Sequence, residues 1–509
     1  MTSKPSRRPA ADHKARSRPS RPAQSGQGHP ARRAHAPQSG RSPQNREPRL
    51  SALRLAPDSL GFALDCAAQA VTAVRGGAAL PAALAAVSGS LPASAVSLAR
   101  GATQDIAYRT MRCLATVDRV IALRVHKAPP AHVTNMLACA LALLCDESEQ
   151  PSYAAFTVVD QAVNAVGARR EVSFAKGLVN AVLRGFLRER DTLLAEVRQD
   201  EVARWNYPQW WIDATRRAWP DAWQGILATG NDHGPLTLRV NARRSNVADY
   251  LALLREQHID ATQSGEQAVT LAVPTPVDRI PGFASGVVSV QDAGAQLAAR
   301  SLDVRDGMRV LDACAAPGGK TGHLLELADI DLVALESDPA RVPRIAENLQ
   351  RLGLDAEIRV GDAGEPSQWH DGQPFDRILA DVPCSASGIV RRHPDIRWLR
   401  RASDIDALVA EQRRILQALW PLVKPGGELL YVTCSIFPEE GELQARWFES
   451  FHQDAVRLDA PGQLLPTAHR ASAEARGGSG TAAEASRAAA VSEHNANHDG
   501  FFYARFQKR

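Results

Sequence analysis

The chain has 509 residues, enough for two to four domains, and its hydrophobic content of 44% is typical of a soluble globular protein. No run of about 18 uncharged apolar residues occurs, and the polar N-terminus lacks an apolar segment, so neither a membrane span nor a signal peptide is expected. The seven cysteines are widely spaced without a CxxC pair, which argues against a disulfide framework and a zinc site. We therefore expect a cytoplasmic protein without a metal centre.

The net charge of +4 is unevenly distributed along the chain. Residues 1–50 contain twelve Lys or Arg and two acids, so the remaining chain carries −6. This segment is also rich in Pro, Ser, Gln and Gly, and it predicts a disordered basic tail over residues 1–52. Such a tail is either merely solvated or a weak, non-specific RNA-binding arm. Any nucleic-acid surface on the folded part must then be a local patch.

Residues 53–195 are predicted to form helices throughout. Residues 102–127 follow the helical period, with an apolar face opposite a basic face that carries Arg109, Arg112 and Arg119. The apolar stretch Met136–Cys145 is too short for a membrane span and indicates a buried helix. One basic helix is usually just solvated, but a second one near residues 176–190 makes a polyanion-facing surface equally plausible. We predict Arg109 and Arg112 as RNA contacts.

Residues 196–285 are predicted to form a helical connector followed by a small α/β unit. The connector holds five of the nine tryptophans, which are more easily explained as interdomain core than as base-stacking platforms. From Leu236 the sequence LTLRVN alternates like a strand, a helix follows at Val247–Gln257, and AVTLAV is again strand-like.

Residues 286–509 alternate between strands and helices, which predicts a parallel sheet. The expected strands are Arg309–Ala313, Leu332–Glu336, Glu357–Val360, Arg377–Asp381 and Glu428–Cys434. Residues 466–497 are of low complexity and predict a disordered insertion. The apolar GFFYARFQ behind it should return to the sheet as a last strand.

A glycine turn follows the first of these strands, at Pro317–Gly319. A strand, a glycine turn and a helix together let a nucleotide-like ligand approach the backbone. GGKT resembles the end of a P-loop, but Cys314 stands where that motif requires its first glycine, and G-x-G-x-x-G is absent. An ATPase is therefore excluded, and a pyrophosphate ligand is poorly supported.

Acidic residues end successive predicted strands: Asp312, Glu336, Asp362 and Asp381. A single acid of this kind is often a helix N-cap. Four in series favour a ligand site, because the carboxyl ends of parallel strands converge on one crevice, where an acid can hold ribose hydroxyls. An acidic crevice suits S-adenosylmethionine, which carries two hydroxyls, an ammonium and a sulfonium.

Two cysteines, Cys384 in DVPCS and Cys434 in YVTCS, follow strands that open toward the same crevice. A free cysteine is usually a small buried apolar residue, and that explanation fits the helical ones better than these two. A thiolate beside a methyl donor could add to carbon 6 of a pyrimidine and make carbon 5 nucleophilic, while an acid near ring nitrogen 3 would stabilise the adduct.

At this point a family resemblance is evident. ACAAPGGKT, ADVPCSASGIVRRHPDIRW and YVTCS resemble the signature motifs of the NOL1/NOP2/Sun RNA cytosine-C5 methyltransferases, over about residues 55–465 and the last strand. The resemblance implies three domains: an all-α NusB-like RNA-binding domain, a small α/β linker domain and a C-terminal α/β Rossmann-like class I methyltransferase domain. It also implies S-adenosylmethionine as cofactor and 16S ribosomal RNA, free or in an early small-subunit intermediate, as substrate. We expect a monomer.

The resemblance also assigns site residues. The cofactor segment corresponds to Cys314, Ala315, Ala316, Pro317, Gly318, Gly319 and Lys320, with Glu336, Asp362 and Asp381 as further ligands. The family usually has Asp at the position of Glu336, and the longer acid can still reach a ribose. Asp381 would face the cytosine and Cys384 would assist product release. The residues alone leave the choice of nucleophile open, whereas the resemblance favours Cys434.

The loop behind Cys384 contains Arg391, Arg392 and His393. A solvated charge run is the simplest explanation, but beside the crevice these side chains are predicted to hold the RNA backbone. The target cytosine must be unstacked to reach the pocket, so a single-stranded or loop cytosine is expected.

Two alternatives remain. A DNA cytosine-C5 methyltransferase using Cys384 would need a sizeable target-recognition insertion, and only a low-complexity loop is present. A non-catalytic NusB-like RNA-binding protein would not need the acids and both thiols.

Overall fold

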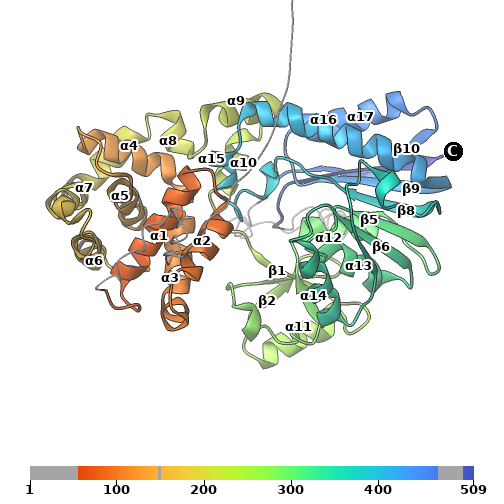
Figure 1. Cartoon of the computed structure of the whole chain (residues 1–509), viewed down its shortest axis with the longest axis horizontal. Helices are drawn as coiled ribbons and strands as arrows, with labels where there is room; N and C mark the ends of the chain where they lie inside the picture. Colours follow the sequence, from red (N-terminus) through yellow and green to blue (C-terminus); the bar gives the residue numbers. More distant parts are fainter. Residues whose placement is uncertain (1–54, 147–150, 468–496) are drawn as a thin grey trace, which may run out of the picture. The chain divides into compact units, whose positions relative to one another are not determined.

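The computed structural model describes residues 55–146, 151–467 and 497–509 (Figure 1). The basic tail predicted at 1–52 lies outside the described residues, and so does nearly all of the insertion predicted at 466–497.

The regular structure of the N-terminal region is helical, as the sequence predicts. Its described helices are α1 (Leu60–Arg75), α2 (Leu80–Gly89), α3 (Ala93–Arg112), α4 (Leu114–Arg124), α5 (Ala131–Leu144), α6 (Ala155–Ala168), a short 3-10 turn (Ser173–Ala175) and α7 (Lys176–Val197). The side chains of α5 are mostly Ala, Leu and Val on all sides of the helix, and the helix is buried along almost its whole length. The buried helix predicted at Met136–Cys145 is therefore confirmed. None of the described helices is long and apolar enough to cross a membrane.

The helical period over residues 102–127 is interrupted in the structure. The chain leaves helical geometry at Cys113, with φ −114° and ψ 22°, so α3 ends and α4 begins there. Arg109 and Arg112 therefore belong to one helix and Arg119 to the next. No glycine or proline marks the break, and apolar periodicity alone could not reveal it.

The connector contains the helices α8 (Glu201–Trp205), α9 (Gln209–Ala218) and α10 (Trp223–Thr229). Its tryptophans pack with residues that lie far away in the sequence, including Val390 and Phe437. The centroids of the Trp211 and Phe437 rings lie 5.3 Å apart, and Trp219 Nε1 donates to the Ile436 carbonyl oxygen at 2.8 Å. The predicted interdomain core is thus confirmed.

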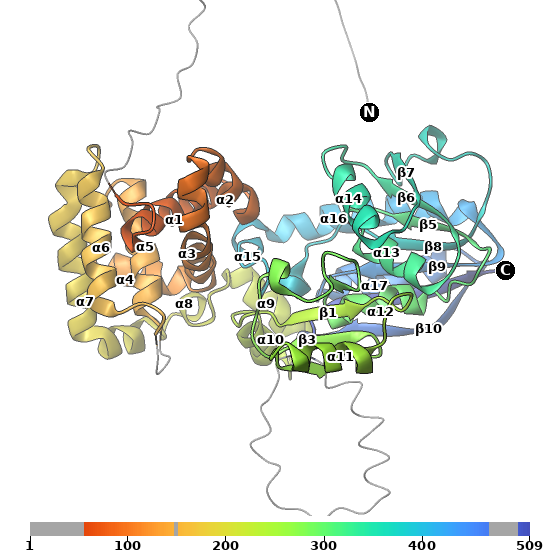
Figure 2. The same cartoon turned by 90° about the horizontal axis from the view of Figure 1, so that it is seen from below.

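The small unit is a four-stranded antiparallel sheet in the order β2-β3-β1-β4, with one long helix (Figure 2). Its elements are β1 (Leu236–Val240), α11 (Val247–Glu256), β2 (Ala261–Gln263), β3 (Ala268–Leu271), a 3-10 turn (Val277–Arg279) and β4 (Val288–Val290). Because β4 pairs with β1, the small sheet continues to Val290, past the boundary predicted after residue 285. A three-residue strand is too short to show a period.

The C-terminal domain is built on a seven-stranded sheet in the order β10-β11-β9-β8-β5-β6-β7. Its strands are β5 (Arg309–Ala313), β6 (Asp331–Glu336), β7 (Glu357–Val360), β8 (Phe375–Asp381), β9 (Val423–Thr433), β10 (Ala455–Leu464) and β11 (Phe501–Lys508). Its helices are α12 (Ala293–Ser301), α13 (Gly319–Leu327), α14 (Val342–Leu352), α15 (Ile396–Leu399), α16 (Ala402–Leu419) and α17 (Glu442–Phe451). α12 to α14 lie on one face and α16 and α17 on the other (Figure 1).

The strand order places a ligand crevice at a defined point of this sheet. β7, β6, β5, β8 and β9 run parallel, and the direction of winding reverses between β5 and β8. In open α/β sheets, ligands bind beyond the carboxyl ends of the strands at this switch point. β11 inserts antiparallel between β9 and β10, which confirms the predicted return of the last strand to the sheet behind the insertion.

Candidate active site

The turn Cys314–Gly318 connects β5 to α13 and has a specific backbone shape. Gly318 has φ +90°, and a Cβ there would lie 3.1 Å from the Ile345 Cα, so only glycine fits without displacement. The Gly318 N–H donates to the Ala315 carbonyl oxygen at 2.7 Å and closes the turn. The first N–H groups of α13 have no intrahelical partners, as at the start of any helix, and they follow the carboxyl end of β5.

Side chains from α14, from its N-cap and from β1 bind carbonyl oxygens of this turn and of Gly319, the first residue of α13. Arg341 donates to the Ala316 oxygen at 2.8 Å, and Asn348 donates to the Gly318 oxygen at 3.0 Å. Arg239, from β1 of the small unit, donates to the Gly319 oxygen at 2.8 Å. The small unit therefore helps to fix the turn on which the predicted cofactor segment lies.

Arg239 also forms a fully buried bidentate ion pair with Glu326 of α13, at 2.7 and 2.8 Å. Removing one partner of such a pair costs about 3–5 kcal/mol, because the other charge stays buried and unpaired. We therefore expect Arg239→Met to lower the denaturant midpoint of unfolding markedly. Arg243→Met is the matched control, since its pair with Asp329 is exposed and such pairs contribute about 0–1 kcal/mol. Equal midpoints for the two variants would contradict this expectation.

Three of the predicted acids lie at the carboxyl ends of β5, β6 and β7. Asp312 is buried, accepts from Thr321 at 2.6 Å through Oδ2, and leaves Oδ1 without a partner among the described residues. Burial raises the pKa of this carboxyl to about 7, against the opposing hydrogen bond from Thr321. Glu336 accepts from the Ala316 N–H at 3.2 Å and from the Asp338 N–H at 3.0 Å, which ties the end of β6 to the glycine turn.

Asp362, behind β7, is the most exposed of these acids and is bound by Arg414 of α16 at 2.8 Å. Burial is the largest single effect and opposes ionisation, but the hydrogen bonds from Arg414 and the Gly364 N–H together with the Arg414 charge outweigh it and lower the pKa of Asp362. It is therefore ionised at neutral pH and already carries a cationic partner.

The two predicted thiols meet. Cys384 follows β8, Cys434 follows β9, and their Sγ atoms lie 3.4 Å apart. The pKa of Cys384 is raised well above its ordinary value, first by its hydrogen bond with Cys434 and then by burial. Cys384 therefore keeps its proton at neutral pH.

A charged pair stands between the turn and the thiols. Lys320 Nζ, in the first turn of α13, lies 2.6 Å from Oδ2 of Asp381 at the end of β8. Burial disfavours the Lys320 ammonium, but the Asp381 charge outweighs it and raises the pKa of Lys320. From the sequence, Lys320 is predicted only as part of the cofactor segment. In the structure its side chain donates to Asp381, the acid predicted to face the cytosine.

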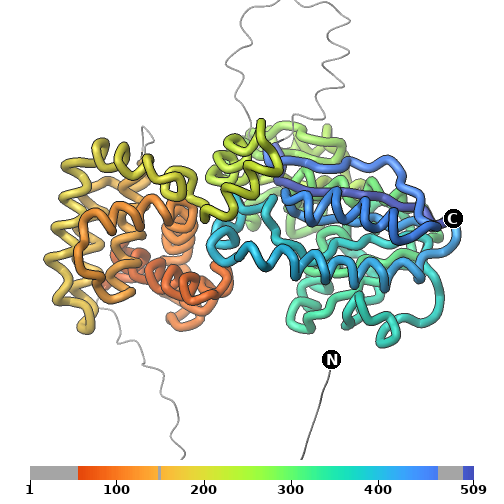
Figure 3. The backbone as a smooth tube through the Cα atoms, turned by 90° about the horizontal axis from the view of Figure 1, so that it is seen from above, coloured from red at the N-terminus to blue at the C-terminus, as the bar shows by residue number. Residues whose placement is uncertain are grey.

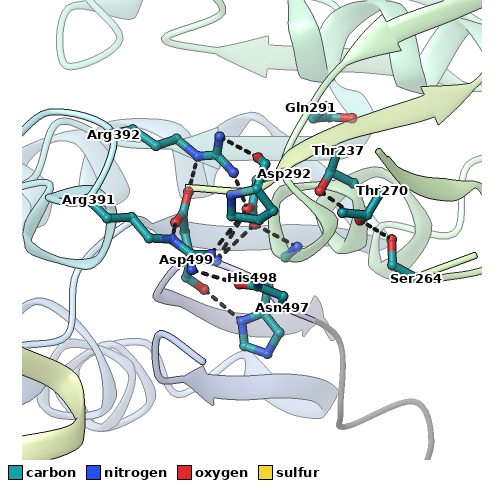
Figure 4. A network of polar contacts seen from close by, with 12 residues as sticks. Thr237, Ser264, Thr270, Gln291, Asp292, Arg391, Arg392, Asn497, His498 and Asp499 are labelled. Atoms are coloured by element: carbon teal, nitrogen blue, oxygen red, sulfur yellow. Dashed lines mark hydrogen bonds and ion pairs between the residues drawn. The ribbon is translucent and has the colours of Figure 1, made fainter. Parts of the chain in front are cut away.

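The predicted RNA contact Arg391 needs correction. Arg391 is only 1% exposed and is ion-paired with Asp499, just before β11 (Figure 4). Arg392 bonds both Asp499 and Asp292, the N-cap of α12. The sequence alone indicated cationic side chains free to bind RNA, because the carboxylates that pair with them, Asp292 and Asp499, lie about a hundred residues away on either side. Arg391 is thus not available to RNA.

The other predicted RNA contacts are also partly engaged within the chain. Arg109 forms ion pairs with Asp105 at 2.8 Å and Asp146 at 2.9 Å. Arg112 donates to the Arg391 carbonyl oxygen at 3.0 Å, and burial lowers its pKa to about 10. His393 is half-buried, and burial lowers its pKa. For Arg392, His393, Arg109 and Arg112, a role in RNA binding stays a prediction.

The segment around α15 joins the catalytic domain to the helical region (Figure 3). Asp395 accepts from the Leu80 N–H at 2.8 Å, and Trp398 Nε1 donates to the Met111 carbonyl oxygen at 2.8 Å. Arg397 is buried, lies over the Tyr207 ring at 3.9 Å and donates to the Gly230 carbonyl oxygen at 2.6 Å. The signature stretch behind Cys384 is thus an anchor between domains.

The residues at the switch point fit the predicted cofactor. The unpartnered buried oxygen of Asp312 suits an ammonium group. The carboxylates of Glu336 and Asp362 suit hydroxyl groups. The free N–H groups at the start of α13 suit a carboxylate. No group of three or more His, Cys, Asp or Glu side chains that could hold a metal ion occurs among the described residues.

Comparisons with known proteins point to one family. The profile of the family described as 16S rRNA methyltransferase RsmB/F matches residues 299–507, and that of the RsmF/B-like ferredoxin-like domain matches residues 207–278. Ribosomal RNA small subunit methyltransferase B of Pseudomonas syringae is 40% identical over 417 residues, which cover 80% of this chain and 89% of that protein. The protein of the same name from Vibrio cholerae is 46% identical over 299 residues, 57% of this chain and 69% of that protein.

The fold also has a solved counterpart. The crystal structure of PH0851 covers 90% of this chain and all of its own, with a TM-score of 0.68 and 23% sequence identity. The reversed winding of the sheet, the paired thiols at its carboxyl edge and a relative of 40% identity over most of both chains lead to one conclusion. The chain belongs to the RsmB/F family of 16S rRNA methyltransferases.

Proposed function

We propose that this protein transfers a methyl group from S-adenosylmethionine to carbon 5 of a cytosine in 16S ribosomal RNA. The observation that carries the proposal is the approach of two free thiols to 3.4 Å at the carboxyl ends of β8 and β9, beside the Lys320–Asp381 pair. A methyl transfer to oxygen or to an exocyclic amine would need no thiol. Carbon 5 of cytosine does, because it is too electron-poor to attack a methyl group unaided.

In the proposed mechanism the Cys434 thiolate adds to carbon 6 of the flipped cytosine. The new S–C6 bond pushes the π electrons of the C5–C6 bond into the ring, so carbon 5 becomes part of an electron-rich enamine, and ring nitrogen 3 takes up a proton from solvent. The cofactor, when bound, supplies an electrophilic sulfonium methyl group. Carbon 5 then forms its bond to that methyl group, the bond from the methyl group to sulfur breaks, its electron pair stays on the sulfur, and S-adenosylhomocysteine leaves. Loss of the carbon 5 proton to a base returns the electrons, breaks the S–C6 bond and regenerates the thiolate. Ring nitrogen 3 returns its proton to solvent.

The other residues hold groups during these steps. Oδ2 of Asp381 accepts from Lys320 Nζ. The second oxygen of Asp381 is assigned to the cytosine edge, where it accepts from the amino group and from the protonated ring nitrogen. Cys384, which stays protonated and whose sulfur lies 3.4 Å from that of Cys434, is assigned to product release. Ala315, Ala316 and the glycine turn, with Glu336 and Asp362, are assigned to the cofactor.

The role of the Asp381 charge can be tested with a variant whose side chain has the same shape. We expect Asp381→Asn to lower single-turnover methyl transfer by about 10²- to 10³-fold, because a preorganised charge at the reacting base is lost. Asp376→Asn is the control: that acid lies on the same strand, 2.8 Å from Lys424, away from the crevice. A similar loss in both variants would indicate damage to β8 rather than loss of the charge.

The RNA surface is proposed to include the helical domain at 53–195, as its resemblance to NusB implies. A cavity of about 890 Å³ lies where α1, α4 and α8 meet α15. Arg75, Arg119 and Arg401 line it together with Asp200 and with Asp118, which is ion-paired with Arg75. None of the thiols or crevice acids lines this cavity, so it could hold backbone phosphates of RNA flanking the target rather than the base itself.

The experiment that tests the proposal uses labelled methyl donor, the full-length protein and ribosomal RNA that lacks the modification. Digestion to nucleosides is expected to yield labelled 5-methylcytidine, and mapping of the labelled fragment identifies the cytosine. Label in any other nucleoside, or in none, would overturn the proposal.

A further inference from the structure

We propose that Glu440 is a positioning residue that sets the spacing of the two active-site thiols. This inference rests on the proposed function, because it concerns how Cys384 and Cys434 are held for that reaction. Glu440 ends a 3-10 turn, Pro438–Glu440, behind β9, and its side chain is completely buried. A buried carboxylate is costly unless it is fully hydrogen-bonded, so its bonding partners indicate what it does.

The carboxylate of Glu440 joins the loops that carry the two thiols. Oε1 accepts from the N–H of Ser385 at 2.8 Å, and Oε2 accepts from the Ser385 hydroxyl. Oε2 also accepts from the hydroxyl of Ser435 at 2.7 Å. Ser385 directly follows Cys384, and Ser435 directly follows Cys434. One side chain is therefore bonded to the residue next to each sulfur.

Further contacts fix the same carboxylate and the loops around it. Gln412 of α16 donates to Oε1 at 3.1 Å and to the Pro383 carbonyl oxygen at 3.0 Å. Ser387 and Ser435 share a hydrogen bond of 2.9 Å, and the Gly388 N–H donates to the Cys434 carbonyl oxygen at 2.9 Å. All four donors to the carboxylate are neutral, so its charge is not consumed by an ion pair.

This arrangement has a consequence for the chemistry. The two loops leave neighbouring strands, and the β8–β9 ladder ends at Asp381 and Val432, before either thiol. Beyond that point the cluster around Glu440 holds the loops together, while Glu440 itself touches neither sulfur. Because displacement of a reacting group by about 1 Å can cost 10²-fold in rate, loss of this tie should impair catalysis without removing a catalytic group.

The test compares Glu440→Ala and Glu440→Gln with Glu439→Ala, the exposed neighbouring glutamate. We expect Glu440→Ala to lower single-turnover methyl transfer by about 10²-fold, with binding of S-adenosylmethionine unchanged. Glu440→Gln should recover most of the rate, because the amide oxygen still accepts from Ser385 and its NH₂ can donate to Ser435. Glu439→Ala should match the unaltered protein.

The second readout is independent of activity. Phenylarsine oxide bridges two adjacent sulfurs, so it should protect Cys384 and Cys434 together from alkylation in the unaltered protein, as peptide mapping would reveal. We expect this joint protection to be lost in Glu440→Ala and kept in Glu440→Gln. If Glu440→Ala does not fold, Ser385→Ala and Ser435→Ala, which each remove one hydroxyl from the carboxylate, should show a weaker form of the same loss.

Full rate and full joint protection in Glu440→Ala, or in both serine variants, would overturn the inference. If phenylarsine oxide protects both thiols of the unaltered protein but the protein methylates no cytosine, the proposed function is refuted. The role of Glu440 in spacing the sulfurs would then still stand.

Discussion

Replacing Cys434 with alanine is expected to abolish methyl transfer, with a loss of at least about 10⁴-fold in single-turnover rate. Without the sulfur no S–C6 bond forms, and carbon 5 of the cytosine stays electron-poor. Cys384 is not expected to take over, because burial still raises its pKa when the hydrogen bond with Cys434 is gone, and because it approaches from the neighbouring strand. The measurement is transfer of labelled methyl groups to undermodified ribosomal RNA.

The control for this experiment is Cys113→Ala, which removes a cysteine at the break between α3 and α4, far along the chain from the crevice. Cys113→Ala should retain activity, and Cys434→Ala should still bind S-adenosylmethionine, since the cofactor segment is intact. Substantial methylation by Cys434→Ala would remove this residue from the mechanism.

Replacing Cys384 with alanine is expected to have the opposite outcome: a covalent RNA–protein adduct that accumulates. The nucleophile remains, so addition and methyl transfer proceed, but the group assigned to product release is missing. The first turnover should slow by no more than about tenfold, the scale of one lost hydrogen bond to the thiolate. Labelled RNA should then migrate with the protein as a retarded band in a denaturing gel.

The double variant Cys384→Ala with Cys434→Ala provides the control, since the band should disappear when the nucleophile is also removed. A band that persists in the double variant would mean that another residue forms the adduct. Cys384→Ala without any band, but with normal turnover, would mean that release does not need this thiol.

Much of the catalytic domain could be predicted from the sequence because its signals are local. The strands ending at Ala313, Glu336 and Asp381 are short apolar runs followed by turns or acids, and the structure has all three with the predicted ends. The convergence of Cys384 and Cys434 could be predicted because both follow strands of one parallel sheet, and such strands end at one edge.

The features that the sequence did not reveal depend on partners distant in the chain. Arg391 resembled an RNA contact because its partner Asp499 lies beyond the insertion. Arg239 resembled an ordinary strand residue, although its guanidinium binds α13. Glu440 stands in PEEGE next to exposed Glu439, and nothing local distinguishes the buried acid from the solvated one.

The central claim is that Cys434 attacks carbon 6 of a cytosine in 16S ribosomal RNA. The most direct measurement uses RNA in which cytidine is replaced by 5-fluorocytidine, whose fluorine cannot leave as a proton does, so the methylated adduct is trapped. After digestion of protein and RNA, mass spectrometry should find the nucleotide, with its transferred methyl group, attached to the peptide that contains Cys434. Attachment to Cys384, or no attachment while ordinary RNA is methylated, would contradict the account.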